Sequence, residues 1–270
     1  TTTRLVAAPD QYRFEGEDLG DWFAAQIQAQ IDDMNANGIK FAGFLADSIF
    51  SSDGVIPNPI GFLKKAVDVV HANGGIFIAD EVQPGFARTG DSFWGFGRHG
   101  VVPDIITTGK PMGNGIPVSG LLAKDHVLSA FSQKIPYFNT FGGNPVAMAA
   151  AQAVLKTIQE EELQAHSQRL GGLLLTELRK LMEKYDCVGD VRGAGLFIGF
   201  ELVQDRFTKM PDKALALDLI EELRNTHRVL TSVAGPYGNV LKLRPPLVFQ
   251  EKDIDWLVGA LDQALSKLQK

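Results

Sequence analysis

The stretch Ile76-Phe-Ile-Ala-Asp80-Glu-Val82-Gln83 decides the fold, because an apolar run passes directly into a carboxylate. A second short apolar run, which starts at Ile105, ends in Thr107-Thr108-Gly109-Lys110. Such runs are typical of buried parallel strands, and open α/β sheets bind their ligands just beyond the carboxyl ends of these strands. We therefore expect Asp80 and Lys110 to converge on one crevice from neighbouring strand ends.

This pair has a bland interpretation and a functional one. An isolated Asp is usually a helix cap or a surface acid, and an isolated Lys is usually a solvated amine. Here a buried strand delivers Asp80 into a cleft, and Lys110 stands between another buried strand and a loop rich in Gly, Pro and Asn. A desolvated lysine becomes a usable nucleophile, and an acid beside it suits pyridoxal phosphate, which has a basic ring nitrogen and an aldehyde. The residues alone leave both interpretations open.

Composition is that of an ordinary globular protein and disfavours several classes. The 270 residues are 45% hydrophobic and 21% charged, enough for one large domain or two smaller ones. A net charge of −6 without a basic block disfavours nucleic-acid binding, and no apolar stretch is long enough to span a membrane. The N-terminus lacks the features of a signal peptide, and the single cysteine, Cys187, favours a reducing, cytoplasmic setting. The five histidines lack ligand spacing, so we expect no metal site.

Hydrophobic periodicity predicts alternating helices and strands in the first half of the chain. The expected elements are a helix over 18–37, a strand over 41–46, a helix over 60–72, and strands over 76–80, 105–108 and 118–123. Residues 84–104 contain no convincing regular element, and so long a loop in a compact domain is usually functional or covers a site. The alternation predicts an α/β fold with a mostly parallel sheet and crossover helices.

The second half has a different character, which begins at the strong helix start Asn144-Pro145. The expected elements are helices over 146–158 and 160–185, a hairpin over 188–203, a helix over 211–226, strands over 229–232 and 240–243, and a helix over 253–268. We therefore predict that residues 1–160 are part of a large domain and that residues 161–270 form a small α+β domain.

Two glycine-rich stretches do not fit phosphate-binding motifs. Gly109-Lys110 is followed by Pro111, and Asp104 stands where a P-loop needs glycine. The stretch Gly193-Ala-Gly195-Leu-Phe-Ile-Gly199 has one residue too many for a dinucleotide fingerprint and no βαβ context. We expect this second stretch to form a hairpin turn.

A long ordered match surrounds Asp80 and Lys110. It runs through Ile78-Ala-Asp80-Glu-Val-Gln83-Pro-Gly85-Phe-Ala-Arg88-Thr-Gly90 and then Pro103-Asp104-Ile-Ile-Thr-Thr-Gly-Lys110-Pro-Met-Gly113-Asn-Gly115-Ile-Pro117. It closely resembles the signature of the class III (ω-type) aminotransferases, which are fold-type I pyridoxal-phosphate enzymes. The resemblance extends through Thr140-Phe-Gly-Gly-Asn144-Pro145, Val191-Arg-Gly-Ala-Gly195-Leu and Leu243-Arg244-Pro-Pro246, so it covers nearly the whole chain.

The resemblance implies a fold-type I enzyme and a role for each matching residue. Lys110 would form a Schiff base with the cofactor and later move a proton between the substrate and cofactor carbons. Asp80 would pair with the pyridinium nitrogen, so that the ring acts as an electron sink. Val82 would pack on one face of the ring, and Gln83 would hydrogen-bond near the ring hydroxyl.

The resemblance also implies contacts beyond the ring. Thr140 would contact the cofactor phosphate, in this family usually from the neighbouring subunit, so a homodimer is expected. Arg244 would hold the substrate α-carboxylate as a bidentate fork. The plainer alternatives are a core residue for Val82 and a surface ion pair for Arg244. We expect a structural role for Arg88 and a helix-capping role for Asn144.

The chain departs from the family pattern at several positions. Family members are typically longer at the N-terminal side, where they carry the Gly/Ser-rich turn that grips the cofactor phosphate and an aromatic residue that stacks on the ring. Neither feature is found here. Ala8-Pro-Asp-Gln-Tyr-Arg13 and Phe50-Ser-Ser-Asp-Gly-Val-Ile-Pro57 look closer to the alanine–glyoxylate aminotransferase 2-like branch, which includes phospholyases.

Three functions therefore stay open at this point. The first is transfer of an amino group from an amine or amino acid to a 2-oxo acid. The second is a lyase reaction on the same scaffold, in which phosphate or another group is eliminated. The third is a catalytically silent fragment that holds the cofactor too weakly for turnover. A transaminase needs an added acceptor such as 2-oxoglutarate, whereas a lyase does not.

Overall fold

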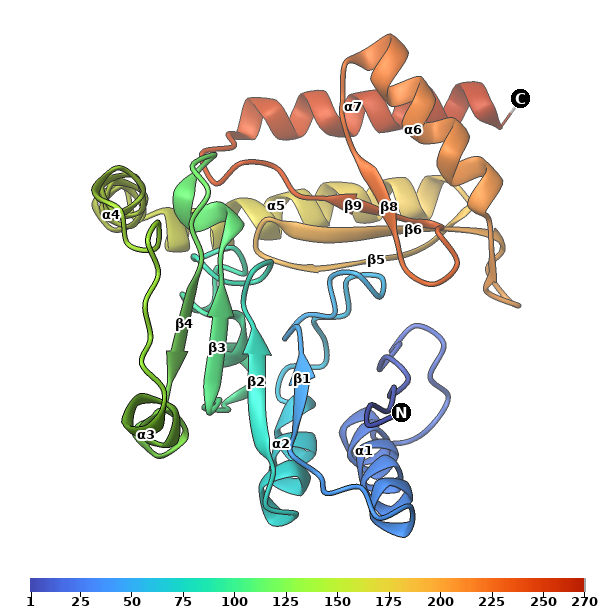
Figure 1. The fold of residues 1–270 in the computed structure, drawn as a ribbon. Helices are drawn as coiled ribbons and strands as arrows, with labels where there is room; N and C mark the ends of the chain where they lie inside the picture. Colours follow the sequence, from blue (N-terminus) through green and yellow to red (C-terminus); the bar gives the residue numbers. More distant parts are fainter. Residues whose placement is uncertain (270) are drawn as a thin grey trace.

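Residues 1–269 are described by a computed structural model, in which two separate β-sheets lie one above the other (Figure 1). The first sheet has four strands in the order β1-β2-β3-β4. Its strands are β1 (Gly43–Ala46), β2 (Ile76–Asp80), β3 (Ile105–Thr108) and β4 (Gly120–Ala123). Strands β1, β2 and β3 are parallel, and β4 runs antiparallel to β3. The expected α/β fold with a mostly parallel sheet is confirmed.

Strand register brings the carboxyl ends of β2 and β3 to the same edge of this sheet. Asp80 is the register partner of Thr107, and the backbone N–H of Glu81 donates to the Thr107 carbonyl at 2.9 Å. Strand β3 ends at Thr108, and Lys110 follows after a single residue, Gly109. Asp80 and Lys110, the two residues predicted to carry the chemistry, therefore lie at the carboxyl ends of adjacent strands, on the same edge of the sheet.

Two helices cover one face of the first sheet, namely α1 (Leu19–Ala36) and α2 (Leu63–Ala72). Apolar residues at helical spacing on both helices pack against strand residues such as Phe77 and Ala79. Asp18 caps α1 by accepting a hydrogen bond from the backbone N–H of Asp21 at 2.9 Å. Helix α2 begins later than residue 60 because Gly61 has a φ of +89°, which is incompatible with an α-helix.

The second sheet is antiparallel and carries its helices on one face (Figure 1). Its strands are β5 (Val188–Ala194), β6 (Phe197–Asp205), β7 (Met210–Pro211), β8 (Ser232–Ala234) and β9 (Val240–Leu243). Its helices are α5 (Leu163–Lys184), α6 (Lys213–His227) and α7 (Glu251–Leu268). A leucine-rich core lies between them, and the hairpin turn expected near Gly195 joins β5 to β6. The other face of this sheet meets the first sheet's loops, where Phe197 packs with Ile49 and Val55.

The remaining helices are α3 (Asp125–Lys134), α4 (Pro145–Glu160) and the short 3₁₀ helices η1 (Gly95–His99) and η2 (Lys110–Gly113). Asn144 caps α4 as expected, because its Oδ1 accepts from the backbone N–H of Ala147 at 3.0 Å. Helix α3 and strand β7 were not expected from the sequence. Strands β1 and β4 are shorter than expected at their N-terminal ends, and β8 lies two to three residues later than the expected strand over 229–232.

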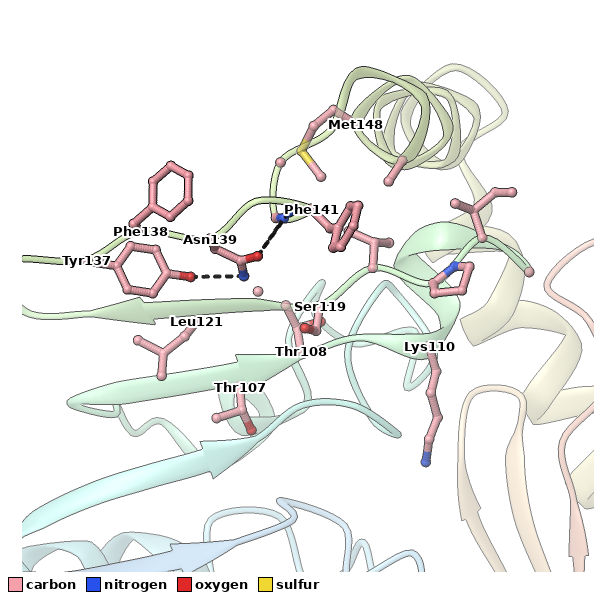
Figure 2. A pocket seen from close by; sticks show the side chains of 18 residues that line it. Thr107, Thr108, Lys110, Ser119, Leu121, Tyr137, Phe138, Asn139, Phe141 and Met148 are labelled. Atoms are coloured by element: carbon pink, nitrogen blue, oxygen red, sulfur yellow. Dashed lines mark hydrogen bonds between the residues drawn. The ribbon is translucent and has the colours of Figure 1, made fainter.

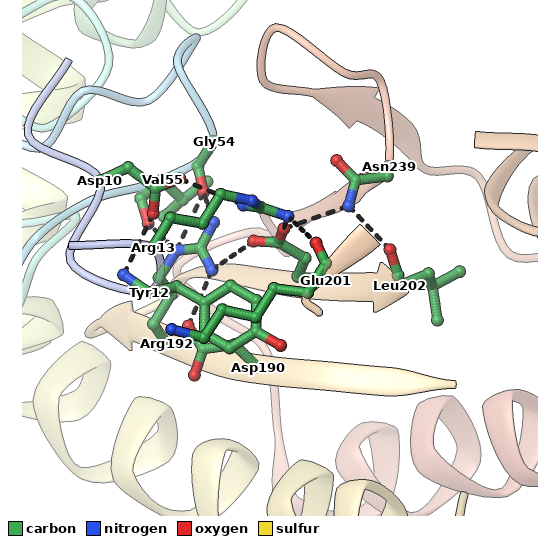
Figure 3. Close-up of polar contacts among 11 residues, drawn as sticks. Asp10, Tyr12, Arg13, Gly54, Val55, Asp190, Arg192, Glu201, Leu202 and Asn239 are labelled. Carbon is green, nitrogen blue, oxygen red and sulfur yellow. Dashed lines mark hydrogen bonds and ion pairs between the residues drawn. The ribbon is translucent and has the colours of Figure 1, made fainter. Parts of the chain in front are cut away.

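A buried ionic network ties the second sheet to the N-terminal part of the chain (Figure 3). Arg192 of β5 donates to the carbonyls of Gly54 and Val55 and to Glu201 of β6, with distances of 2.6, 2.7 and 2.7 Å. Arg13 reaches the same carboxylate at 2.6 Å. The network links β5 and β6 of the second sheet to the loop that follows β1 of the first sheet. Removal of one partner from a buried pair typically costs about 3–5 kcal/mol, so this link is expected to be strong. The domain boundary at residues 160 and 161 stays a prediction.

Candidate active site

Asp80 presents one oxygen to the protein and leaves the other without a partner. Its Oδ1 accepts from the backbone N–H of Val82 at 3.1 Å and lies 3.5 Å from the Thr107 hydroxyl. Among residues 1–269, no hydrogen bond uses its Oδ2. Asp80 lines a cavity of about 550 Å³, whose wall also includes Phe44 and Asp47. The arrangement offers a carboxylate oxygen to a donor in the space beyond β2.

Lys110 sits at the start of η2, in a backbone conformation that L-residues rarely adopt. Its φ is +38°, and a non-glycine residue held in this region costs about 1–3 kcal/mol, which is typical of functional sites. The side chain is exposed, and it extends away from Tyr137, Phe138 and Met148 (Figure 2). The turn therefore aims the amine into open space next to the strand ends.

A cavity of about 190 Å³ collects most of the residues expected to form the site. It is lined by Val82, Gln83, Arg88, Lys110, Pro111 and Arg244. Arg244 follows β9 of the second sheet, so this cavity lies between residues of the two sheets. The guanidinium of Arg244 donates to Oε1 of Gln83 and lies 5.9 Å from the centre of the Phe197 ring. The structure brings Val82, Gln83, Lys110 and Arg244 together here, whereas Asp80 lines the other cavity.

Arg88 adds a second guanidinium to the lining of this cavity, next to Arg244. Its guanidinium donates to the carbonyl of Leu196 at 3.2 Å and to the carbonyl of Pro245. Burial, together with the nearby charge of Arg244, lowers the pKa of Arg88 to about 10. Both acceptors are backbone groups, so Arg88 fixes the chain on either side of the cavity as expected of a structural residue. It also adds a positive charge that these acceptors do not neutralise.

A fully buried carboxylate stands directly behind Asp80. Glu81 accepts from the Ser48 hydroxyl at 2.9 Å and from the backbone N–H groups of Gly95 and Phe96 at 2.6 and 2.9 Å. Burial raises the pKa of Glu81 to about 7. The long loop over 84–104 is thereby fastened to the end of β2, and Asp80 is held at a rigid strand end.

Thr140 lies apart from this cluster. It belongs to an exposed stretch between α3 and α4, whose aromatic residues Tyr137, Phe138 and Phe141 are 73%, 86% and 82% exposed. That stretch borders a cavity of about 1490 Å³, which Lys110 and Thr107 also line (Figure 2). Thr140 does not line the small cavity around Lys110.

The chemistry of these groups fits pyridoxal phosphate. A protonated ring nitrogen needs a carboxylate acceptor, and Asp80 has an oxygen that no group in the described part of the chain hydrogen-bonds. An aldehyde needs an accessible primary amine, and the exposed Lys110 supplies one at the neighbouring strand end. No cluster of three or more potential metal ligands occurs in the part of the chain that the structure describes. Across residues 1–269, the helices include none whose length and apolar content would let it cross a membrane.

A family model for "Aminotransferase class-III" matches residues 3–265. The chain belongs to the class III aminotransferase family. It is 44% identical to an alanine–glyoxylate aminotransferase 2-like protein of Drosophila melanogaster, over 94% of this chain and 53% of that protein. It is 40% identical to an ethanolamine-phosphate phospho-lyase homologue of Caenorhabditis elegans, over 93% of this chain and 54% of that protein. The resemblance to this branch of the family is confirmed.

Solved structures agree with this assignment. A phospholyase from Arthrobacter, solved in complex with phosphoethanolamine, superposes with a TM-score of 0.88 at 40% identity, over 92% of this chain and 58% of that one. A Bacillus anthracis aminotransferase superposes with a TM-score of 0.88 at 32% identity, over 97% and 61% of the two chains. The chain spans about half the length of the curated relatives it matches.

Sequence reasoning did not single out Lys242, a further cation near this cavity. Burial and the nearby charges of Arg244 and Lys110 lower the pKa of this amine, so it lies within electrostatic reach of both. Lys242 precedes Arg244 by two positions on an extended segment, and alternation along a strand places such residues on one face. The spacing of two residues between Lys242 and Arg244 is the sequence signal that could have identified Lys242.

Proposed function

We propose that this chain carries the catalytic lysine of a pyridoxal-phosphate-dependent aminotransferase, which moves an amino group from an amine or amino acid to a 2-oxo acid. The observation that carries the proposal is the cavity around Lys110, which gathers Val82, Gln83 and Arg244 from both sheets. Membership of the class III family supports the same chemistry.

Each residue has a task that follows from its position. The bound cofactor supplies an electron sink for the bond that breaks at the amino-bearing carbon of the substrate. Lys110 would hold the cofactor through its Nζ and would move a proton between the amino-bearing carbon of the substrate and a carbon of the cofactor. Asp80 would hold the ring nitrogen as a hydrogen-bond acceptor and would keep that nitrogen protonated. Val82 would pack on the ring face, and Gln83 would contact the ring hydroxyl.

Arg244 orients the substrate in this proposal. A guanidinium offers two parallel N–H groups to a carboxylate, so it fixes both the position and the rotation of the substrate. In the structure this guanidinium donates to Gln83, a neutral partner that an incoming carboxylate can displace. The same Gln83 would then be free to turn towards the cofactor ring.

A second copy of the protein would complete the site. The stretch around Thr140 exposes Tyr137, Phe138 and Phe141, and an apolar patch of this kind is typical of an interaction surface. We place Thr140 against the cofactor phosphate of the partner in a homodimer, in a cytoplasmic setting. Replacement of Thr140 by Ala should then weaken cofactor binding in the dimer without changing the fold of either copy.

The decisive experiment locates the amine that holds the cofactor. Full-length protein is loaded with pyridoxal phosphate, reduced with borohydride and digested, and the labelled lysine is found by mass spectrometry. We expect the label on Lys110 and its loss in Lys110→Ala, with Lys252→Ala as a matched control on the exposed surface of α7. A label on another lysine of the wild-type protein would contradict the proposal.

A lyase reaction is the second candidate. Relatives named as phospho-lyases, and the cations around the cavity, favour a substrate that bears a phosphate leaving group. Release of inorganic phosphate from such a substrate in the absence of a 2-oxo acid would identify a lyase. Dependence of turnover on added 2-oxoglutarate would identify a transaminase.

A further inference from the structure

Lys242 lies beside a glycine on the second sheet, at a point where the loop around Gly54 and Val55 approaches that glycine closely. Gly199 of β6 pairs with Arg192 on β5 and with Lys242 on β9, so Gly199 lies between these two cations in one row across the sheet. Directly paired residues point to the same face, and Gly199 places no side chain there. The neighbours of Lys242 on its strand, Leu241 and Leu243, belong to the core under α5, α6 and α7. Lys242 therefore points to the opposite face, towards the first sheet.

Lys242 also lies among positive charges. Partial burial lowers the pKa of the Lys242 amine, and the nearby charges of Arg244 and Lys110 lower it further. Within residues 1–269, no carboxylate oxygen lies within 4.0 Å of the Lys242 amine, although the other cation of its row, Arg192, has two such partners. Lys242 is thus the unneutralised member of the row.

Asp47 favours the charged form of Lys242, and its carboxylate is already engaged. It accepts from the backbone N–H groups of Ile49 and Ser51, each at 2.9 Å, and from the Ser51 hydroxyl. Burial raises the pKa of Asp47. The local charge therefore stays positive around Lys242, Arg244 and Arg88.

Arg88, Lys110 and Arg244 line the small cavity, and Lys242 adds a fourth positive charge close to Arg244 and Lys110. Partly buried cations without a counter-charge are costly unless a ligand pairs with them. A substrate carboxylate carries one negative charge and satisfies Arg244 alone. A phosphate monoester carries close to two negative charges at neutral pH and has acceptor oxygens for both Arg244 and Lys242. The phosphate group matches this charge distribution better than a carboxylate does.

We propose that Lys242 is a substrate-binding residue that, together with Arg244, holds the phosphate of a phosphorylated amine and sets the preference for such amines over simple amino acids. This inference rests on the proposed function, because it places the substrate amine at the cofactor held by Lys110. Lys242 binds and orients the phosphate and takes no proton from the reacting carbon. Its contribution falls as ionic strength rises, because the site opens to solvent.

The test compares two substrates on full-length, cofactor-loaded protein. Steady-state kinetics are measured with phosphoethanolamine and with alanine for the wild type, Lys242→Gln, Lys242→Arg and the surface control Lys252→Gln. For Lys242→Gln we expect KM for phosphoethanolamine to rise about 10- to 100-fold, the range for loss of one charged hydrogen-bond partner, with a smaller change in kcat. KM for alanine should change less than about threefold. Lys242→Arg should keep most of the affinity for phosphoethanolamine.

Inorganic phosphate provides a readout that does not depend on turnover. Its dissociation constant, measured by calorimetry, should rise in Lys242→Gln and stay unchanged in Lys252→Gln. Equal losses with both substrates, or phosphate binding unaffected by Lys242→Gln, would overturn the inference and leave the borohydride label on Lys110 intact. Loss of that label with phosphate binding still dependent on Lys242 would instead contradict the proposed function alone.

Discussion

Arg192 and Lys242 stand on either side of Gly199, on the same face of the same sheet, and their surroundings are opposite. Arg192 is buried, and it contacts Asp190 and Glu201 as well as the carbonyls of Gly54 and Val55. Lys242 is half-buried and faces Arg244 and Lys110, which are both positive. The paired charge of Arg192 stabilises the fold, whereas we assign the unpaired charge of Lys242 to ligand binding.

The largest loss of stability is expected when the counter-charge of Arg192 is removed. Glu201→Gln keeps the shape of a fully buried side chain but removes the negative charge that Arg192 and Arg13 share. We expect a loss of about 3–5 kcal/mol in the free energy of unfolding, because two cations lose a buried counter-charge. Urea denaturation of the full-length protein measures it.

A surface pair serves as the control for this prediction. Glu177→Gln removes an acid that pairs with Lys180 one turn along α5, on the exposed side of the helix. Such pairs contribute about 0.3–0.5 kcal/mol, so this variant should be close to the wild type. Equal stability losses in the Glu201 and Glu177 variants would remove the distinction between the two sides of Gly199.

A smaller effect is expected from a buried group that the fold keeps neutral. His99 donates to the Ser48 carbonyl at 2.8 Å and accepts from the backbone N–H of Gly61 at 3.2 Å, and burial lowers the pKa of His99 to about 4. Because the unfolded chain binds this proton near pH 6.5, unfolding takes up a proton between pH 6.5 and 4, and stability falls as pH falls through that range. The full difference is of the order of 3 kcal/mol.

Comparison with a non-titrating variant isolates the contribution of His99 to the pH dependence of stability. The free energy of unfolding is measured at pH 7 and at pH 4.5 for the wild type and for His99→Gln. The neighbouring Glu81, whose pKa is also shifted, titrates in both proteins, so its contribution cancels to first order. The wild type should lose more stability than the variant over this range. A variant with an equal or larger loss would show that His99 is not kept neutral by burial.

The contrast around Gly199 also explains what the sequence could and could not predict. The apolar run before Asp80 and the short strand before Lys110 are local patterns, and they correctly predicted two parallel strands ending at the same edge. Asn144-Pro145 likewise predicted a capped helix. The proposed role of Lys242 depends on its proximity to Lys110, which is distant in the sequence, and no short stretch of sequence contains that information.

Other failures have similar physical causes. Helix α3 carries Leu128 and Phe131, which remain 44% and 40% exposed. Its N-cap residue, Lys124, makes no capping hydrogen bond and instead pairs with Asp104 at 2.9 Å. The usual start signal was therefore absent. The separate cavity beside Asp80 was also outside the reach of sequence patterns, because it is formed by side chains from several distant segments.

The smallest expected change in stability comes from the unneutralised side of the comparison. Lys242→Gln removes a charge that has no carboxylate partner among residues 1–269 and that repels Arg244 and Lys110. The free energy of unfolding should therefore change by less than about 0.5 kcal/mol, or increase, since relief of like-charge repulsion offsets the lost packing of the lysine stem. A loss above about 2 kcal/mol would show that Lys242 supports the fold as Arg192 does. A stable Lys242→Gln protein that has lost its preference for phosphorylated amines would instead show that this position is maintained for the ligand, at no benefit to folding.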